Sequence, residues 1–167
     1  MRNSLRLAVV GVVAAASFAT SAQAATTATG TATAEVLSSL TVTAVDDLRF
    51  GQIAANTGGT VTVNADLTAS SSGTLVSTGT RGPASFDVVG TPSTMVLVTL
   101  PAAAVNLTRV SGTETMSLGG FNTEPNGAFQ LSGTGTGTFT VGGTLTVASN
   151  QVAGAYTGTF DVSVEYQ

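Results

Sequence analysis

The chain has 167 residues, of which 43% are hydrophobic and 8% charged, and it contains no cysteine, histidine, tryptophan or lysine. The missing residue types exclude the commonest general base, the usual zinc ligands, a thiolate nucleophile and Schiff-base chemistry. The net charge of −4 also argues against nucleic acid and anionic membrane surfaces as partners, because both attract basic proteins.

Residues 1–24 have the features of a bacterial-type export signal. Arg2 and Arg6 give a basic start, Leu7–Phe18 is apolar, and Ala22-Gln23-Ala24 presents the small-x-small pattern that a signal peptidase cleaves. The apolar run is shorter than the roughly 20 residues of a membrane-spanning helix, and a buried N-terminal helix is the alternative. Removal of 24 from 167 residues leaves 143, with three arginines against nine acids and hence a net charge of −6. We expect an exported protein of the periplasm, cell surface or extracellular space.

Residues 25–34 differ from the rest of the mature chain, because threonine alternates with alanine or glycine and no bulky side chain occurs. A strand of this kind would bury little area on either face, so its register would be weakly fixed. Two interpretations stay open. The segment is either a flexible leader or an extended arm that adds a strand to the sheet edge of a neighbouring subunit through main-chain hydrogen bonds.

From about residue 31 to the C-terminus, apolar and polar residues alternate with a period of two, which predicts β-strands. The clearest expected strands are, in chain order, Leu48–Ile53, Thr60–Leu67, Ala84–Val89, Met95–Leu100, a hairpin of Leu107–Val110 with Thr113–Leu118, Thr138–Val147 and Thr159–Tyr166. Strands of this length without helices between them indicate a two-sheet antiparallel β-sandwich of about 7–10 strands rather than a parallel α/β fold. We expect one such domain over residues 35–167, stable without disulfides.

Three of these segments allow more specific predictions. Met95–Val98 is continuously apolar, which predicts a more fully buried strand that Pro101 closes. Gly142-Gly143 predicts a bend or bulge in its strand. In the last segment, the apolar residues at even positions 160–166 are expected to face inward and the polar residues at odd positions 159–165 outward.

Several blocks together resemble the bacterial family DUF4402, a domain of unknown function. The resembling blocks are Leu40–Thr43, Asp47–Ile53, Gly59–Val63, Ala84–Pro92, Gly143–Ala148, Gln151–Phe160 and Val164–Tyr166. They extend over nearly all of the mature chain, and it is their order and spacing that make the resemblance specific.

The resemblance implies an exported, all-β, immunoglobulin-like domain with no settled biochemical role and no catalytic residues to carry over. The closing segment is also similar to that of pilin and spore-coat-U-type subunits, which a periplasmic chaperone and an outer-membrane usher assemble. Two departures from the pilin pattern are evident. The cysteine pair common in pilins is absent, and residues 25–34 lack the bulky alternating side chains that fill a partner's groove.

Two polar motifs have both a functional and a structural interpretation. Asp46-Asp47 offers carboxylates to a calcium ion, but without the spaced acids of a calcium loop a solvated turn is the simpler interpretation. Tyr156 lies between Gly154 and Gly158, where its ring is placed either to bind a sugar or to bond its hydroxyl to nearby backbone, as in a tyrosine corner.

Other polar segments predict structure only. Ser70–Gly73 and Gly133–Gly137 are expected to be loops, because no base activates the serines and no lysine or helix completes a phosphate loop. Asn106-Leu107-Thr108 fits a glycosylation sequon. Arg49, Arg81 and Arg109 are expected to pair with acids across strands.

We therefore expect no catalytic, cofactor-binding or metal-binding residues. The leading hypothesis is a non-catalytic structural or adhesin-like β-sandwich, a pilin-like subunit that assembles by strand addition with itself or other surface subunits, aided by a periplasmic chaperone. The alternative is a periplasmic or extracellular module that binds a ligand such as a carbohydrate, and an envelope enzyme is the third hypothesis.

Overall fold

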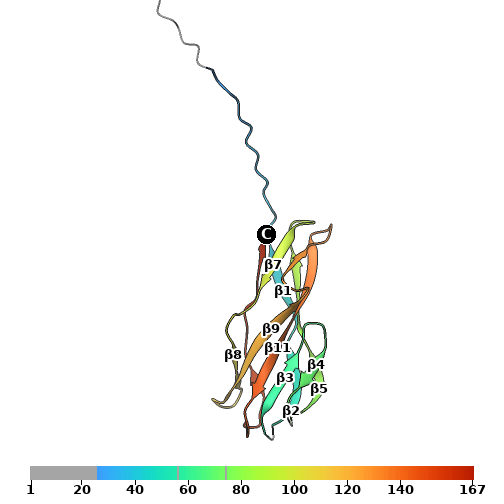
Figure 1. Cartoon of the computed structure of the whole chain (residues 1–167), viewed down its shortest axis with the longest axis vertical. Helices are drawn as coiled ribbons and strands as arrows, with labels where there is room; N and C mark the ends of the chain where they lie inside the picture. Colours follow the sequence, from blue (N-terminus) through green and yellow to red (C-terminus); the bar gives the residue numbers. More distant parts are fainter. Residues whose placement is uncertain (1–25, 56, 74) are drawn as a thin grey trace, which may run out of the picture. The chain divides into compact units, whose positions relative to one another are not determined.

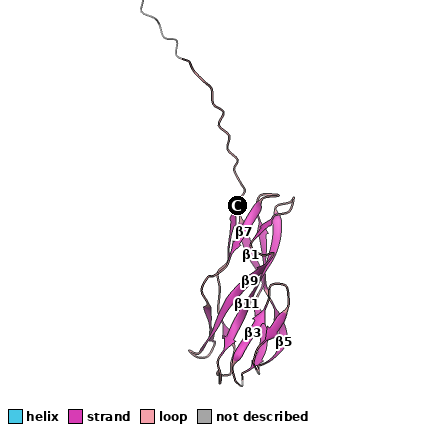
Figure 2. Ribbon diagram, in the orientation of Figure 1, coloured by secondary structure: helices cyan, strands magenta, loops and turns pink. Residues whose placement is uncertain are grey.

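The computed structural model describes residues 26–55, 57–73 and 75–167, and its fold is all-β (Figures 1 and 2). Its strands are β1 (Thr41–Asp46), β2 (Arg49–Ala54), β3 (Gly59–Val63), β4 (Ala69–Ser71), β5 (Val76–Gly82), β6 (Ala84–Val89), β7 (Met95–Thr99), β8 (Val105–Arg109), β9 (Thr115–Glu124), β10 (Ala128–Gln130), β11 (Thr136–Val147), β12 (Tyr156–Thr157) and β13 (Ser163–Tyr166). The number exceeds the expected 7–10 because β4, β10 and β12 are pieces of only two or three residues.

The chain divides into two units, Met1–Glu35 and Val36–Gln167. The predicted export signal lies outside the described residues. Residues 26–35 are exposed and carry neither helix nor strand. None of the described segments is a helix that could cross a membrane.

One layer of the second unit is a long antiparallel sheet with the strand order β1-β6-β11-β9-β8-β12, to which β3 and β4 are added beside β11. The 12-residue strand β11 organises this sheet. Its first half, Thr136–Val141, pairs with β6, and its second half, Gly143–Val147, pairs with β3. Its other edge pairs with β9, and the register shifts between Gly142 and Thr144, so the predicted bulge is confirmed.

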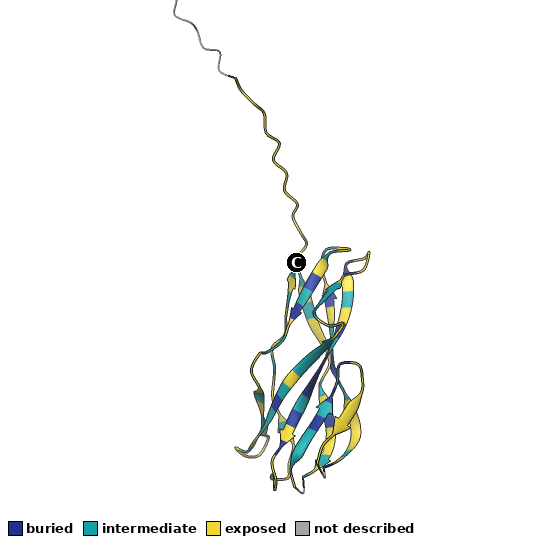
Figure 3. Cartoon of the chain, in the orientation of Figure 1, coloured by how far each residue is buried: buried dark blue, intermediate teal, exposed yellow. Residues whose placement is uncertain are grey.

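The opposite layer consists of two separate sheets. Strands β10-β7-β13 form a three-stranded sheet, and β2 and β5 form a two-stranded ribbon. The core follows the same division (Figure 3). One apolar cluster, which includes Phe50 and Leu145, lies between the ribbon and the long sheet, and a second, which includes Val96 and Phe139, lies between the three-stranded sheet and the long sheet.

The two apolar clusters are continuous with each other. Leu48, Phe121 and Phe160 pack against both of them. The ring of Phe160 lies 5.2 Å from that of Phe121, and 6.3 Å from that of Phe86 in an edge-on arrangement. These contacts join the two halves of the sandwich into one core.

The first and last strands are joined at one end of the sandwich by Tyr166. Its hydroxyl donates a hydrogen bond to the Ser38 carbonyl oxygen (2.9 Å) and accepts one from the Thr91 backbone N–H (2.7 Å). The Ser38 N–H in turn donates to the Thr91 hydroxyl at 2.7 Å. We call this group the Tyr166 clasp, and it closes the sandwich where β1 begins and β13 ends.

The predictions for Thr60–Leu67 and for the run at Met95 need correction. Strand β3 ends at Val63 rather than Leu67, because a turn follows in which Asn64 and Thr68 bond through their backbones and Leu67 takes a φ of 71°. The apolar run at Met95 is not more fully buried, since β7 alternates between buried Val96 and Val98 and an outer face that leaves Met95 exposed. The cause is that the three-stranded sheet has only one neighbour layer.

The C-terminal alternation is confirmed, because residues 160, 162, 164 and 166 are half-buried and the intervening ones exposed. The strand itself is shorter than predicted. Residues 158–162 lie outside any strand because the chain crosses there from β12, in the long sheet, to β13, in the three-stranded sheet. The predicted hairpin of β8 with β9 is present.

Candidate functional site

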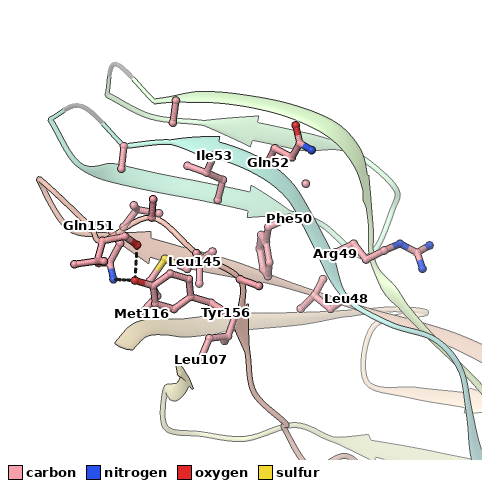
Figure 4. A pocket seen from close by; sticks show the side chains of 18 of the residues that line it. Leu48, Arg49, Phe50, Gln52, Ile53, Leu107, Met116, Leu145, Gln151 and Tyr156 are labelled. Carbon is pink, nitrogen blue, oxygen red and sulfur yellow. Dashed lines mark hydrogen bonds between the residues drawn. The ribbon is translucent and has the colours of Figure 1, made fainter. Parts of the chain in front are cut away.

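A cavity of about 830 Å³ opens between the β2–β5 ribbon and the long sheet (Figure 4). It is lined by the consecutive positions 48–55 that contain β2, by the consecutive positions 151–156, and by separate residues of four other strands, namely Thr80 of β5, Leu107 of β8, Met116 of β9 and Leu145 and Val147 of β11. We call this cavity the β2 groove. It lies at the half of the sandwich away from the Tyr166 clasp, because β11 starts beside the clasp and ends in the groove.

The roof of the groove is formed by Phe50 and Ile53 of β2, which pack on the first apolar cluster. They are three residues apart and yet share a face, because the pairing of β2 with β5 shifts between Phe50 and Gln52. Gly51 makes this bulge possible. Its φ is +74°, which L side chains rarely adopt, and a Cβ there would collide with the Thr78 carbonyl oxygen. Both the backbone conformation and the lack of space therefore require glycine at the bulge.

The floor is apolar and only partly covered. Leu145 and Val147 of β11 are 2% and 3% exposed. Leu107 of β8 and Met116 of β9 lie beside them and are only half-buried. Figure 4 shows Leu107, Met116 and Leu145 below Phe50. The floor therefore has apolar surface that the chain's own ribbon leaves open to water.

The wall opposite β2 is fixed by hydrogen bonds. The Tyr156 hydroxyl donates to the Val152 carbonyl oxygen at 2.7 Å and accepts from the Gln151 side-chain amide at 2.8 Å (Figure 4). The Arg109 guanidinium holds the same segment through the Ala153 carbonyl oxygen at 3.0 Å. The structural interpretation of Tyr156 is thus confirmed, since its hydroxyl bonds nearby backbone.

Charge is sparse around the groove. Arg49 is the only charged residue among the described lining positions, and its side chain points outward in Figure 4. It lies 3.9 Å from the Asp46 carboxylate, with both side chains about half exposed. Behind the wall, Glu114 lies 3.3 Å from Arg109. The pKa of Glu114 is lowered by hydrogen bonds from backbone N–H groups, of which its own contributes most, and by the neighbouring Arg109 guanidinium. Because no carboxylate faces the cavity from the described lining, the groove is suited to holding an apolar or extended partner.

The Asp46-Asp47 pair lies where β1 ends, with Asp46 as the last residue of β1 and Asp47 in the link to β2, and both residues are exposed. The Asp46 carboxylate accepts a hydrogen bond from the Ser85 hydroxyl at 3.0 Å and faces Arg49. Among the described residues no group of three or more potential metal ligands gathers. Asp46 is thus occupied by contacts within the chain.

The other predicted positions lie apart from the groove. The segment Ser70–Gly73 is not entirely a loop, because β4 covers its first two residues and pairs with β3. Asn106 is exposed on β8. The predicted loop Gly133–Gly137 is also only partly a loop, because residues 133–135 form a turn and Thr136 and Gly137 already belong to β11. Of the arginines, Arg109 pairs with Glu114 within the β8–β9 hairpin and Arg49 with its chain neighbour Asp46, whereas Arg81 forms no ion pair with the described residues.

Sequence reasoning did not single out Phe50, Ile53 or Met116 as site residues. One local signal was available for the first two. Gly51 interrupts the alternation of its strand, so the apolar residues fall three positions apart instead of two. That spacing marks a bulge, but it does not say what lies beneath it.

Comparison with curated proteins gives no match to this chain, and comparison with solved structures gives none either. A family model does match. Residues 40–166, which include every strand of the sandwich, match the family described as "Domain of unknown function (DUF4402)". The chain is therefore a member of the DUF4402 family.

Proposed function

We propose that this protein is a non-catalytic, exported structural subunit, pilin-like or adhesin-like, which assembles by adding a strand to the sheet of a neighbouring copy. The observation that carries the proposal is the state of residues 26–39. They alternate in the manner of a strand over much of their length, yet all of them are exposed and none belongs to a strand. Apart from Ser38, which the Tyr166 clasp holds, their backbone groups are free to pair with a sheet edge elsewhere.

Strand addition needs little from side chains, because main-chain hydrogen bonds supply the affinity. An unpaired edge strand is a template for such pairing. The sandwich contains several edges of this kind, since β1, β2, β4, β5, β10, β12 and β13 each have one strand partner. Because residues 26–34 lack the bulky side chains with which pilin segments fill a partner's groove, main-chain hydrogen bonds would have to supply most of the affinity here.

The composition supports a non-catalytic role. The chain has no histidine, cysteine or lysine, and the described lining of its groove has no carboxylate. Export follows from the leader at residues 1–24. A periplasmic chaperone is the partner expected for a subunit with open edges, because it would cover them before assembly.

The test uses the full mature chain from Ala25 and measures its association by sedimentation velocity. We expect concentration-dependent association, weakened about tenfold in the double variant Ala32→Pro/Thr33→Pro, because adjacent prolines remove N–H donors on both sides of the arm. The matched control is Ala32→Ser/Thr33→Ser, which keeps both N–H groups and should associate as the parent does. A mature protein that stays monomeric up to millimolar concentration contradicts the proposal.

A second candidate function is ligand binding, and the volume of the β2 groove favours it. About 830 Å³ lies within the range of small-molecule sites. If the ligand is a carbohydrate stacked on Tyr156, binding on a glycan array should persist in Tyr156→Phe and disappear in Tyr156→Ala. Equal binding by both variants would remove Tyr156 from this function.

A further inference from the structure

We propose that the β2 groove is the acceptor site for residues 30–35 of a second copy of this chain, which add antiparallel to β2. This inference rests on the proposed strand addition and names the edge and the segment involved. It follows from four features: the free edge of β2, the uncovered floor, the reach of the arm and the placement of charge.

The first feature is the way β2 borders the cavity. If only one face of β2 bordered the cavity, every second residue of the strand would line it, because successive side chains point to opposite sides. Here all eight positions from Leu48 to Ala55 line it. The backbone edge of β2 therefore borders the groove, and β5 is its only strand neighbour in the described part of the chain.

The second feature is the floor. Leu107 and Met116 pack on the first cluster but stay only half-buried. A strand laid beside β2 would cover this surface and would gain about 25 cal/mol for each Å² of apolar area removed from water. Small residues border the space on both sides, namely Ala54, Ala55, Ala153, Gly154 and Ala155, which leaves room for a backbone.

The third feature is the reach of the arm, which requires a second copy. The Tyr166 clasp holds Ser38 at the start of β1, whereas Arg49 follows the end of β1. The six residues of β1 span roughly 20 Å, but the three residues from Ser38 back to Glu35 span only about 10 Å. A chain's own Glu35 thus cannot reach its own Arg49, while the arm of another copy has no such limit.

The fourth feature fixes the register. Glu35 is the only charged residue between Ala25 and Ser39, and Arg49 is the only charged residue in the described lining of the groove. Placing Glu35 opposite Arg49 and running antiparallel puts Ala34 opposite Phe50. Opposite residues of an antiparallel pair share a face, and at the β2 bulge Thr33 lies opposite both Gly51 and Gln52, which places Ala32 opposite Ile53. Ala34, Ala32 and Gly30 therefore turn to the apolar floor while Thr33, Thr31 and Glu35 face water. One register satisfies both the charges and the small side chains.

The register is tested by disulfide trapping, which is clean because the chain has no cysteine. Two full mature proteins, Glu35→Cys and Arg49→Cys, are mixed under mild oxidation, and the joined peptides are identified by mass spectrometry. We expect the 35–49 disulfide to form about tenfold faster than the disulfide between Glu35→Cys and Ser71→Cys. Ser71 is the matched control because it is exposed on β4, an edge strand that does not border the β2 groove.

The facing of the arm is tested by two variants that add the same charge. Ala32→Asp places a carboxylate on the apolar floor and should weaken association at least about tenfold, whereas Thr33→Asp leaves it in water and should change association by less than about twofold. Neither substitution lies within the sandwich, so loss of folding does not confuse the result.

The outcomes separate this inference from the function on which it rests. A mature protein that associates, but forms the 35–71 disulfide as fast as the 35–49 disulfide, or loses association equally in both aspartate variants, overturns the assignment to the β2 groove and leaves strand addition standing. A protein that never associates overturns both. Selective formation of the 35–49 disulfide together with selective loss in Ala32→Asp establishes the site.

Discussion

At the scale of single residues, the turn after β3 depends on Asp66. Its carboxylate accepts a hydrogen bond from the Thr68 hydroxyl at 2.5 Å and another from the Thr68 backbone N–H at 2.9 Å. Both lower the pKa of Asp66, the hydroxyl more than the N–H. These bonds stabilise a turn at the positions where the sequence alone predicted that the strand would continue.

The lowered pKa gives a prediction with a definite sign. A carboxyl group whose pKa is lower in the folded state stabilises the fold above its unfolded pKa of about 3.9, and this contribution is lost as the pH falls through the folded value. Thr68→Val removes the stronger donor, so the pKa of Asp66 should rise toward its ordinary value. Carboxyl-detected NMR titration of parent and variant measures this, and identical Asp66 titration curves would contradict the assigned cause.

Residue-level interpretation of the sequence succeeded where the interaction was local. The Tyr156 hydroxyl bonds Val152, four residues away, and the glycines flanking the ring were a visible signal. Interpretation of the sequence failed where the bonding partner is distant in the chain. Nothing in the neighbourhood of Tyr166 indicates that its hydroxyl bonds Ser38, because that contact exists only once two sheets have packed.

At the scale of strands, β11 depends on Gly142. At this residue the neighbour of β11 changes from β6 to β3, and the turn after β3 passes directly against it. A Cβ on Gly142 would meet the Val63 carbonyl oxygen, and would lie 2.5 Å from the Ala65 nitrogen and 2.6 Å from the Asn64 carbonyl carbon. All three are backbone atoms, so they cannot move aside without disturbing the sheet.

Gly142→Ala should therefore lower the free energy of unfolding by about 1–3 kcal/mol, the usual cost of overpacking. Gly133→Ala is the matched control, because a Cβ there has no atom within 4 Å. That variant should stay within about 1 kcal/mol of the parent, since removing a glycine also restricts the unfolded chain. Urea unfolding followed by circular dichroism measures both, and equal stabilities would refute the close approach.

The sequence predicted the faces of strands better than their partners. Alternation alone placed residues 160, 162, 164 and 166 inward, and the glycine pair at 142–143 marked the bulge. It could not show that residues 158–162 cross between sheets, because the alternation continues unbroken through the crossing. The β2 groove was hidden for the same reason, since its floor and roof come from strands far apart in the chain.

At the scale of the whole molecule, one continuous core predicts one cooperative transition. Leu48, Phe121 and Phe160 contact both apolar clusters, so neither half can lose its packing alone. The fluorescence of the two tyrosines reports on the two halves of the sandwich, because Tyr156 lies at the β2 groove and Tyr166 at the clasp. The chain has no tryptophan whose emission would mask theirs.

In Tyr156→Phe and Tyr166→Phe, fluorescence of the remaining tyrosine should follow the same urea curve as far-UV circular dichroism measured on the same variant. Each variant loses about 1 kcal/mol of stability with its hydrogen bonds. Two-state unfolding requires that the probes coincide. A tyrosine signal that changes at lower urea than the dichroism would show that one half of the sandwich unfolds first.

The Tyr166 clasp also dictates when the fold can close. It joins Ser38 and Tyr166, which lie 128 residues apart, and Tyr166 is the last residue of β13. Because a ribosome delivers the N-terminus first, β1 and β6 are synthesised long before the tyrosine that locks them against β13. Until then β7 has one side unoccupied, and the second apolar cluster remains open to solvent. The sandwich therefore cannot close before β13 has been synthesised, and until then the nascent chain exposes part of its apolar core.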